Sequence, residues 1–258
     1  MRAGRLPTRS APGERTSGEP RSANGASSFH LVWEMPPVPL RSVAATLEVL
    51  EPPAVRRLYF WALQVSFVDD RRLAGAAHLG LQWNPHHPAF TAVNWGGYGP
   101  ADAGSTLLRG SDSRLPGSRN DPNTRDFRWE RGRRYRLEVL PVPDADPPAW
   151  RGVVTDLDAG EATLVRELEA GGTHLASPMV WSEVFARCEQ PSVAVRWSDF
   201  EAVGDDGRVV RPRRVRVNYQ SRTDGGCDNT SVIPDELGLL QVTAVQREVP
   251  QGAILALP

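Results

Sequence analysis

The sequence contains no lysine, so all thirty of its basic residues are arginine. It also lacks an excess of either charge, since 31 acidic residues leave a net charge of -1. A near-neutral chain has no general attraction for polyanions, which makes nucleic acid an unlikely partner. No run of eighteen apolar residues is present, so the sequence predicts no transmembrane helix and no membrane partner.

Recognisable catalytic motifs are missing as well. No G-x-S-x-G element marks a serine-hydrolase elbow, and no glycine-rich loop between a strand and a helix marks a phosphate site. The sequence therefore predicts no catalytic residues, and it favours a binding role over an enzymatic one.

Cysteine is scarce, with Cys188 and Cys227 as the two examples. Two cysteines cannot form a zinc site without further ligands at close spacing. The first 28 residues are basic but lack the apolar core of a secretory signal. We therefore expect a cytoplasmic protein with two reduced thiols. A disulfide and secretion are the alternatives if the true start lies upstream.

Short runs of Val, Leu, Trp and Phe, separated by Gly, Pro, Asp and Asn, are typical of many strands joined by turns. In 59–67 the residues Tyr59, Trp61, Leu63, Val65 and Phe67 share one face, as the period of two in a strand requires. The predicted strands are 29–34, 43–50, 58–68, 76–83, 90–96, 126–130, 133–141, 150–157, 161–168, 179–186, 193–200, 211–219, 229–233 and 239–247. For 161–168 and 179–186 a short helix is the alternative.

This pattern predicts an all-β fold, with an antiparallel two-sheet sandwich of the jelly-roll or lectin-like type as the first choice. A closed β-barrel is the alternative. Residues 1–28 are expected to form a disordered arm, because their composition buries too little apolar surface to offset the ordering entropy. Residues 29–258 are expected to form a single domain.

One stretch gathers aromatic and amide side chains, "QWNPHHPAFTAVNWGGYGP" at 82–100. Flat rings pack on the apolar faces of sugars, and amides bond to their hydroxyl groups. The alternation of side chains also places polar residues of neighbouring strands on one face. The predicted ligand-binding residues are Gln64, His78, Gln82, Trp83, Asn94, Trp95 and Tyr98. An ordinary core role for the tryptophans and a solvated face for the polar row are the alternatives.

Other residues suggest rival sites. No cofactor is expected, although calcium is possible at the loops that carry Asp121, Asn123 and Asp126 or Asp224, Asp228 and Asn229. Turn formation explains the same residues equally well. Asp199 and Glu201 lie two apart and are the carboxylate pair of a possible glycosidase.

The stretches "YFWALQVSFVDD", "GAAHLGLQW", "AVNWGGY" and "VNYQSRTDGGCDNTS" resemble an uncharacterised bacterial family of β-rich domains. The resemblance covers about residues 55 to 245. Members of that family pair a Tyr-x-Trp-x-Gln-Val strand, here Tyr59 to Val65, with a following Gly-x-x-Gly-x-Gln strand, here Gly75 to Gln82. It implies a β-rich fold and no particular activity, although some members occur beside carbohydrate-related modules.

Taken together, the sequence predicts a non-catalytic domain that binds carbohydrate or a similar polar ligand. A glycoside hydrolase or lyase is one alternative. A protein-interaction domain with exposed tryptophans as its hot spot is another.

Overall fold

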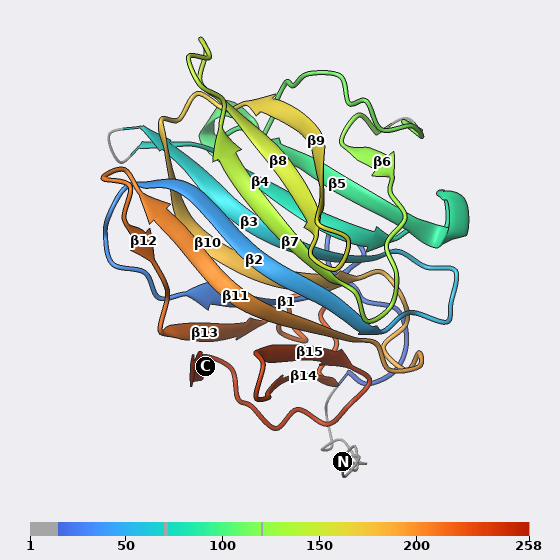
Figure 1. Cartoon of the computed structure of the whole chain (residues 1–258). Helices are drawn as coiled ribbons and strands as arrows, with labels where there is room; N and C mark the ends of the chain where they lie inside the picture. Colours follow the sequence, from blue (N-terminus) through green and yellow to red (C-terminus); the bar gives the residue numbers. More distant parts are fainter. Residues whose placement is uncertain (1–14, 70–71, 120, 258) are drawn as a thin grey trace.

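The computed structural model describes residues 15–69, 72–119 and 121–257, and these form two antiparallel sheets packed face to face (Figure 1). The first sheet has the order β16-β13-β1-β10-β3-β4-β5-β6. Its strands are β1 (Ser27–Trp33), β3 (Tyr59–Asp69), β4 (Arg72–Trp83), β5 (Thr91–Tyr98), β6 (Thr124–Asp126), β10 (His174–Val184), β13 (Arg214–Tyr219) and β16 (Ile254–Ala256).

The second sheet has the order β14-β15-β11-β2-β7-β8-β9, and β12 pairs with the end of β11. In Figure 1 its strands β2, β7 and β8 lie in front of β3, β4 and β5. Its members are β2 (Leu40–Glu51), β7 (Arg134–Pro141), β8 (Ala149–Asp156), β9 (Glu161–Glu169), β11 (Ala194–Gly204), β12 (Val209–Val210), β14 (Thr230–Pro234) and β15 (Leu239–Thr243).

The prediction of an all-β sandwich is confirmed, and the alternative of a closed barrel is wrong. Among the described strands, pairing joins the two sheets only where Leu175 of β10 lies opposite Leu40 of β2, and the described strands leave open edges. The only described helical turns are two short 3-10 segments, η1 (Pro88–Phe90) and η2 (Ala101–Ala103). Residues 161–169 and 174–184 are strands, so the helical alternative for both is also wrong.

The core lies between the sheets and is built from one row of each strand. Tyr59, Trp61, Leu63, Val65 and Phe67 are all buried there, as their alternation predicts. The row opposite them on β3 faces away from the core. The outer face of the first sheet is therefore available for other purposes.

Gln241 of β15 is a polar side chain inside this core, and its hydrogen-bonding groups are used. Its Oε1 accepts bonds from Ser182 Oγ at 2.7 Å and Trp197 Nε1 at 2.9 Å, and its Nε2 donates to the carbonyl of Phe29 at 2.8 Å. Buried polar groups are tolerated when they are bonded in this way. This amide ties the second sheet to β1 and β10, which carry part of the outer face described below.

Part of the expected disordered arm is folded. Residues 1–14 lie outside the described residues, but the backbone N–H of Arg15 donates to Asp228 and that of Arg21 donates to the carbonyl of Gly225. β1 then begins at Ser27. Ordered structure therefore begins no later than Arg15, and the expected boundary after residue 28 is too late.

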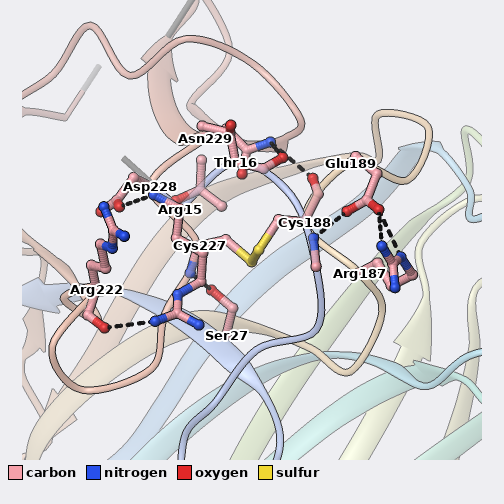
Figure 2. Close-up of a disulfide and its surroundings, with 12 residues drawn as sticks. Arg15, Thr16, Ser27, Arg187, Cys188, Glu189, Arg222, Cys227, Asp228 and Asn229 are labelled. Atoms are coloured by element: carbon pink, nitrogen blue, oxygen red, sulfur yellow. Dashed lines mark hydrogen bonds and ion pairs between the residues drawn. A yellow bond between two sulfur atoms is a disulfide. The ribbon is translucent and has the colours of Figure 1, made fainter. Parts of the chain in front are cut away.

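Cys188 and Cys227 form a disulfide, so the expectation of two reduced thiols is wrong (Figure 2). The bridge joins the chain just after β10 to the loop before β14, across a sequence separation of 39 residues. Structural disulfides persist in oxidising compartments, so the argument for a cytoplasmic protein loses its basis. Within the described residues no helix has the length and apolar character that a membrane crossing requires.

The disulfide is expected to stabilise the fold substantially. Replacing both cysteines by serine should lower the free energy of unfolding by about 3 to 4 kcal/mol, because the unfolded chain regains the entropy of an open loop of this length. Urea denaturation of the wild type with and without a reductant measures the effect. The double serine variant is the control, since the reductant must leave its midpoint unchanged. An equal midpoint for oxidised and reduced wild type contradicts the prediction.

Candidate functional site: a groove on the outer face of the first sheet

The outer face of the first sheet carries a groove of about 620 Å³. On β4 its wall is formed by small residues, at Gly75 and Ala76. Asn24 from the segment before β1 borders one end, and the loop 99–105 after β5 borders the other. The sandwich thus supplies a rigid floor, and two irregular segments supply the ends.

A cluster of rings forms the floor between these ends. The imidazole of His78 meets Phe60 and Trp181 edge to face, with ring centroids 5.4 and 5.7 Å apart. Phe60 and Trp181 contact each other at 4.9 Å. Burial lowers the pKa of His78 to about 4, although the negative charge of Asp121 acts in the opposite direction. His78 is therefore uncharged at neutral pH.

Gln64 points into the groove beside His78, its direct partner in the β3–β4 register. The indole Nε1 of Trp181 donates a hydrogen bond of 2.9 Å to Gln64 Oε1. Because an indole nitrogen can only donate, the Gln64 atom that faces Trp181 must be the amide oxygen. The amide Nε2 then points to other partners. Gln64 therefore offers two N–H donors to a ligand.

Glu183 of β10 stands at the end of the groove that Asn24 borders. Its register partner across the sheet is Ser28 of β1, so the hydroxyl and the carboxylate are cross-strand neighbours. Burial raises the pKa of Glu183, and a hydrogen bond from Asn24 opposes the shift. Among the described residues that line the groove, Glu183 is the only acidic one. Burial also lowers the pKa of nearby His30, which favours its uncharged form.

The structure brings three of the seven predicted ligand residues together in this groove. Gln64 and His78 are half-buried, and Tyr98 is 50% exposed at the border with the loop 99–105. All three lie on the outward row of their strands. The polar face expected from the alternation therefore exists at these positions.

Gln82 and Asn94 share that face but are covered. They are only 4% and 6% exposed. Asn84 Nδ2 donates to Gln82 Oε1 at 2.9 Å, and Asn94 Nδ2 donates to Thr124 Oγ1 at 2.8 Å. Thr124 of β6 and Asn84 after β4 thus occupy the surface where a ligand was expected, so a ligand-binding role for these two residues is wrong.

Trp83 and Trp95 face the opposite way. Trp95 is fully buried in the core, and Trp83 is half-buried against the same core with its Nε1 bonded to the carbonyl of Val55. Neither side chain lies on the groove face, since Trp83 pairs in register with core residue Tyr59 and Trp95 with core residue Leu79. The alternative of a core role for the tryptophans is confirmed, and their expected role in stacking on a ligand is wrong.

The sequence reasoning missed half of the groove. Asn24, Ser28, Trp181 and Glu183 come from two segments about 155 residues apart that meet in the β1–β10 pairing. The signal for Trp181 and Glu183 was their period of two within 179–186, but their strand neighbours could not be assigned from sequence. Asn24 and Ser28 lie within the segment that the composition predicts to be disordered.

The rival carboxylate pair does not form a site. Asp199 lies in a β-bulge of β11 with φ of 50°, where the register against β2 shifts by one residue. Glu201 is paired with Arg136 at 3.1 Å and with Arg211. A paired carboxylate whose neighbour is displaced by a bulge does not make the two-acid arrangement of a glycosidase.

The calcium loops are engaged in contacts of their own. Asp121 accepts the N–H of Asn123 at 2.9 Å, Asp126 is bonded to His87 at 2.6 Å, and Asp228 accepts the N–H of Arg15 at 2.6 Å. Within the described part of the chain, no group of three or more His, Cys, Asp or Glu residues is arranged to hold a metal ion. Calcium binding stays a prediction.

No family model matches the chain, and no curated protein matches its sequence. The resemblance to an uncharacterised domain family therefore stays a prediction. Similar solved structures include Scytalido-glutamic peptidase with a peptide-based transition-state analogue, at a TM-score of 0.46 and 11% identity, over 88% of this chain and 99% of that one. A second structure of that peptidase, with a transition-state analogue inhibitor, has a TM-score of 0.43, 12% identity and the same coverage. SCP-B, a member of the eqolisin family of peptidases in complex with a tripeptide, has a TM-score of 0.43 and 11% identity, also over 88% and 99%.

The expected function, a non-catalytic carbohydrate-binding domain, is contradicted. The tryptophans that were to stack on a sugar lie in or against the core. The glycosidase alternative is wrong for the pair Asp199 and Glu201. The protein-interaction alternative required exposed tryptophans, and all eight tryptophans lie among the described residues without one being exposed.

Proposed function

We propose that the protein is a hydrolase that cleaves amide bonds of an extended peptide lying in the groove, with Glu183 as the general base. The observation that carries the proposal is Glu183 itself, an acidic side chain whose pKa is raised by burial and which faces a groove beside a hydroxyl group. Perturbed carboxyl groups in clefts are the usual acids and bases of hydrolysis.

The chemistry needs one water molecule. The ionised Glu183 takes a proton from this water as its oxygen attacks the carbonyl carbon of the substrate. The hydroxyl of Ser28, on the neighbouring strand, donates to Gln220 Oε1 at 3.4 Å in this structure. In the reaction it turns to donate instead to the negative charge that develops on the carbonyl oxygen. Protonated Glu183 then returns its proton to the leaving nitrogen as the C–N bond breaks, so a carboxylic acid and an amine are released.

The part of the groove at Gln64, away from Glu183, suits a peptide main chain. Glu183 pairs with Phe60 in the register, and Gln64 lies four residues further along β3. At about 3.3 Å per residue this is about 13 Å, the length of roughly four residues of an extended peptide. The free N–H donors of Gln64 can therefore bind a main-chain carbonyl away from the bond that is cleaved.

A side-chain preference follows from the apolar border of the groove. Leu73 and Tyr98 are 47% and 50% exposed there. Tyr98→Ala should raise KM about tenfold for peptides with a large apolar residue at this position and leave kcat unchanged, because about 1 to 2 kcal/mol of apolar contact is lost. Steady-state kinetics with an apolar peptide and its alanine counterpart checks this. An equal rise of KM for both peptides contradicts the assignment.

The direct test is a digest of a peptide library by the oxidised protein between pH 3 and pH 8, with new termini identified by mass spectrometry. Cleavage that appears as pH rises through the raised pKa of Glu183 supports the proposal. A library left intact over the whole range overturns it. The disulfide supports the further proposal that the protein acts in an oxidising compartment, such as outside the cell.

A further inference from the structure

The segment before β1 makes a tight turn, and the side chain of Asn24 in this turn lines the groove. The N–H of Gly25 donates to the carbonyl of Ser22 at 3.0 Å, and Gly25 has φ of 78°, a conformation suited to glycine. Within this turn Asn24 Oδ1 accepts the N–H of Ala26 at 3.2 Å. The single proton of Ser22 Oγ is shared between Asn24 Oδ1 at 2.8 Å and the carbonyl of Ala26 at 2.6 Å. The orientation of the Asn24 amide is therefore fixed by its own turn.

With Oδ1 bonded to the N–H of Ala26, Nδ2 is the group that faces β10. It donates a hydrogen bond of 2.8 Å to Glu183 Oε1, across a sequence separation of 159 residues. A donor at this distance favours the ionised carboxylate over the neutral acid. It also holds the side chain in one rotamer, which leaves Oε2 for a water molecule in the groove.

The disulfide holds the same segment in place (Figure 2). The N–H of Cys188 donates to the carbonyl of Gly18 at 2.9 Å, and the N–H of Cys227 donates to Ser27 Oγ at 2.8 Å. Cys188 itself follows Glu183 by five residues. The disulfide therefore joins the two parts of the chain that are hydrogen-bonded to this segment on either side of Asn24, at Gly18 and at Ser27.

We propose that Asn24 is a positioning residue that keeps Glu183 ionised and turned toward the groove. Its catalytic consequence rests on the proposed function, but its effect on Glu183 does not. The other titratable groups that line the groove near Glu183 are His30 of β1 and His78 of β4. Burial favours their uncharged forms, so they leave Asn24 as the group that sustains the charge of Glu183.

Two variants test the role of Asn24. Asn24→Ala removes the donor, and Asn24→Asp replaces it with an oxygen that repels the carboxylate. Both should move the titration of the Glu183 carboxyl carbon, followed by ¹³C NMR and assigned with Glu183→Gln, to higher pH, with the larger shift for Asn24→Asp. The acidic limb of the pH–rate profile should move with it, so that a rise of about one pH unit in Asn24→Asp lowers its rate about tenfold one pH unit below the wild-type midpoint.

Ala23→Ser, an exposed change in the same turn, is the control and should alter neither curve. The NMR titration needs no turnover, so the two proposals can fail separately. An unchanged Glu183 titration in both Asn24 variants overturns the positioning role even if peptides are cleaved. A shifted titration in a protein that cleaves no peptide supports the positioning role and overturns the proposed function.

Discussion

Glu183→Gln is expected to lower kcat/KM for peptide cleavage by about 10² to 10⁴-fold at pH values where Glu183 is ionised, because glutamine keeps the shape of the side chain and its bond to Asn24 but cannot accept a proton. The residual rate should also lose its acidic limb, since the group that titrates is gone. Initial rates from pH 3 to pH 8 on one cleaved peptide measure both effects. Glu161→Gln, an exposed change on β9 of the other sheet, is the matched control.

The same variant should separate catalysis from stability. The folded-state pKa of Glu183 is raised, so the folded protein binds a proton more readily than the unfolded chain does. The stability from this group is present below the unfolded pKa and is lost as pH rises through the folded pKa. Glu183→Gln should therefore be more stable than the wild type at pH 7 and equal to it at low pH. A variant that is inactive because it is less stable at pH 7 contradicts a catalytic role for Glu183.

The alternation of side chains located part of this site because it is a local property. On β3 the core row from Tyr59 to Phe67 leaves Gln64 on the opposite face, and the same argument places His78 there on β4. Whether such a face stays open depends on segments far away in the chain. Asn94 obeys the alternation, yet Thr124 covers it, and no short-range pattern records that contact.

The pairing of distant strands was the second feature of the site that the sequence could not predict. Ser28 and Glu183 become neighbours through the pairing of β1 with β10, which depends on the whole sandwich. The low apolar content of 1–28 favoured disorder when read alone. The turn at Ser22–Gly25 and the contacts around the disulfide order residues 15–26 despite that composition. Tertiary contacts at this end of the molecule therefore outweigh the local preference.

The tryptophans show a different error, since the parity that places them was present in the sequence. Trp83 follows Leu79 and Leu81 at a period of two, and both leucines are fully buried. An aromatic residue in phase with a core row belongs to the core unless the register changes. Composition suggested a ligand at 82–100, but the phase of the alternation already pointed the larger rings inward.

Trp95→Ala is therefore expected to lower the free energy of unfolding by about 3 to 5 kcal/mol. Any effect of this substitution on ligand binding should follow from the lost stability. Trp95 contacts Phe67 at 6.5 Å between ring centroids, and its Nε1 donates to the carbonyl of Trp150 at 3.3 Å. A Cβ at Gly152 would come within 2.7 Å of its ring, so the opposite sheet is shaped to receive it. Alanine leaves a cavity between the sheets and a carbonyl without its donor.

Tyr98→Ala is the matched control for this prediction, because Tyr98 lies three residues further along β5 on the outer face. It should change the free energy of unfolding by less than about 0.5 kcal/mol, as surface changes usually do. Urea denaturation followed by circular dichroism measures both variants. If Tyr98→Ala were the destabilising change and Trp95→Ala the neutral one, the register of β5 would be displaced by one residue. The groove face would then be the core face, and the placement of Gln64, His78 and Glu183 would fail with it.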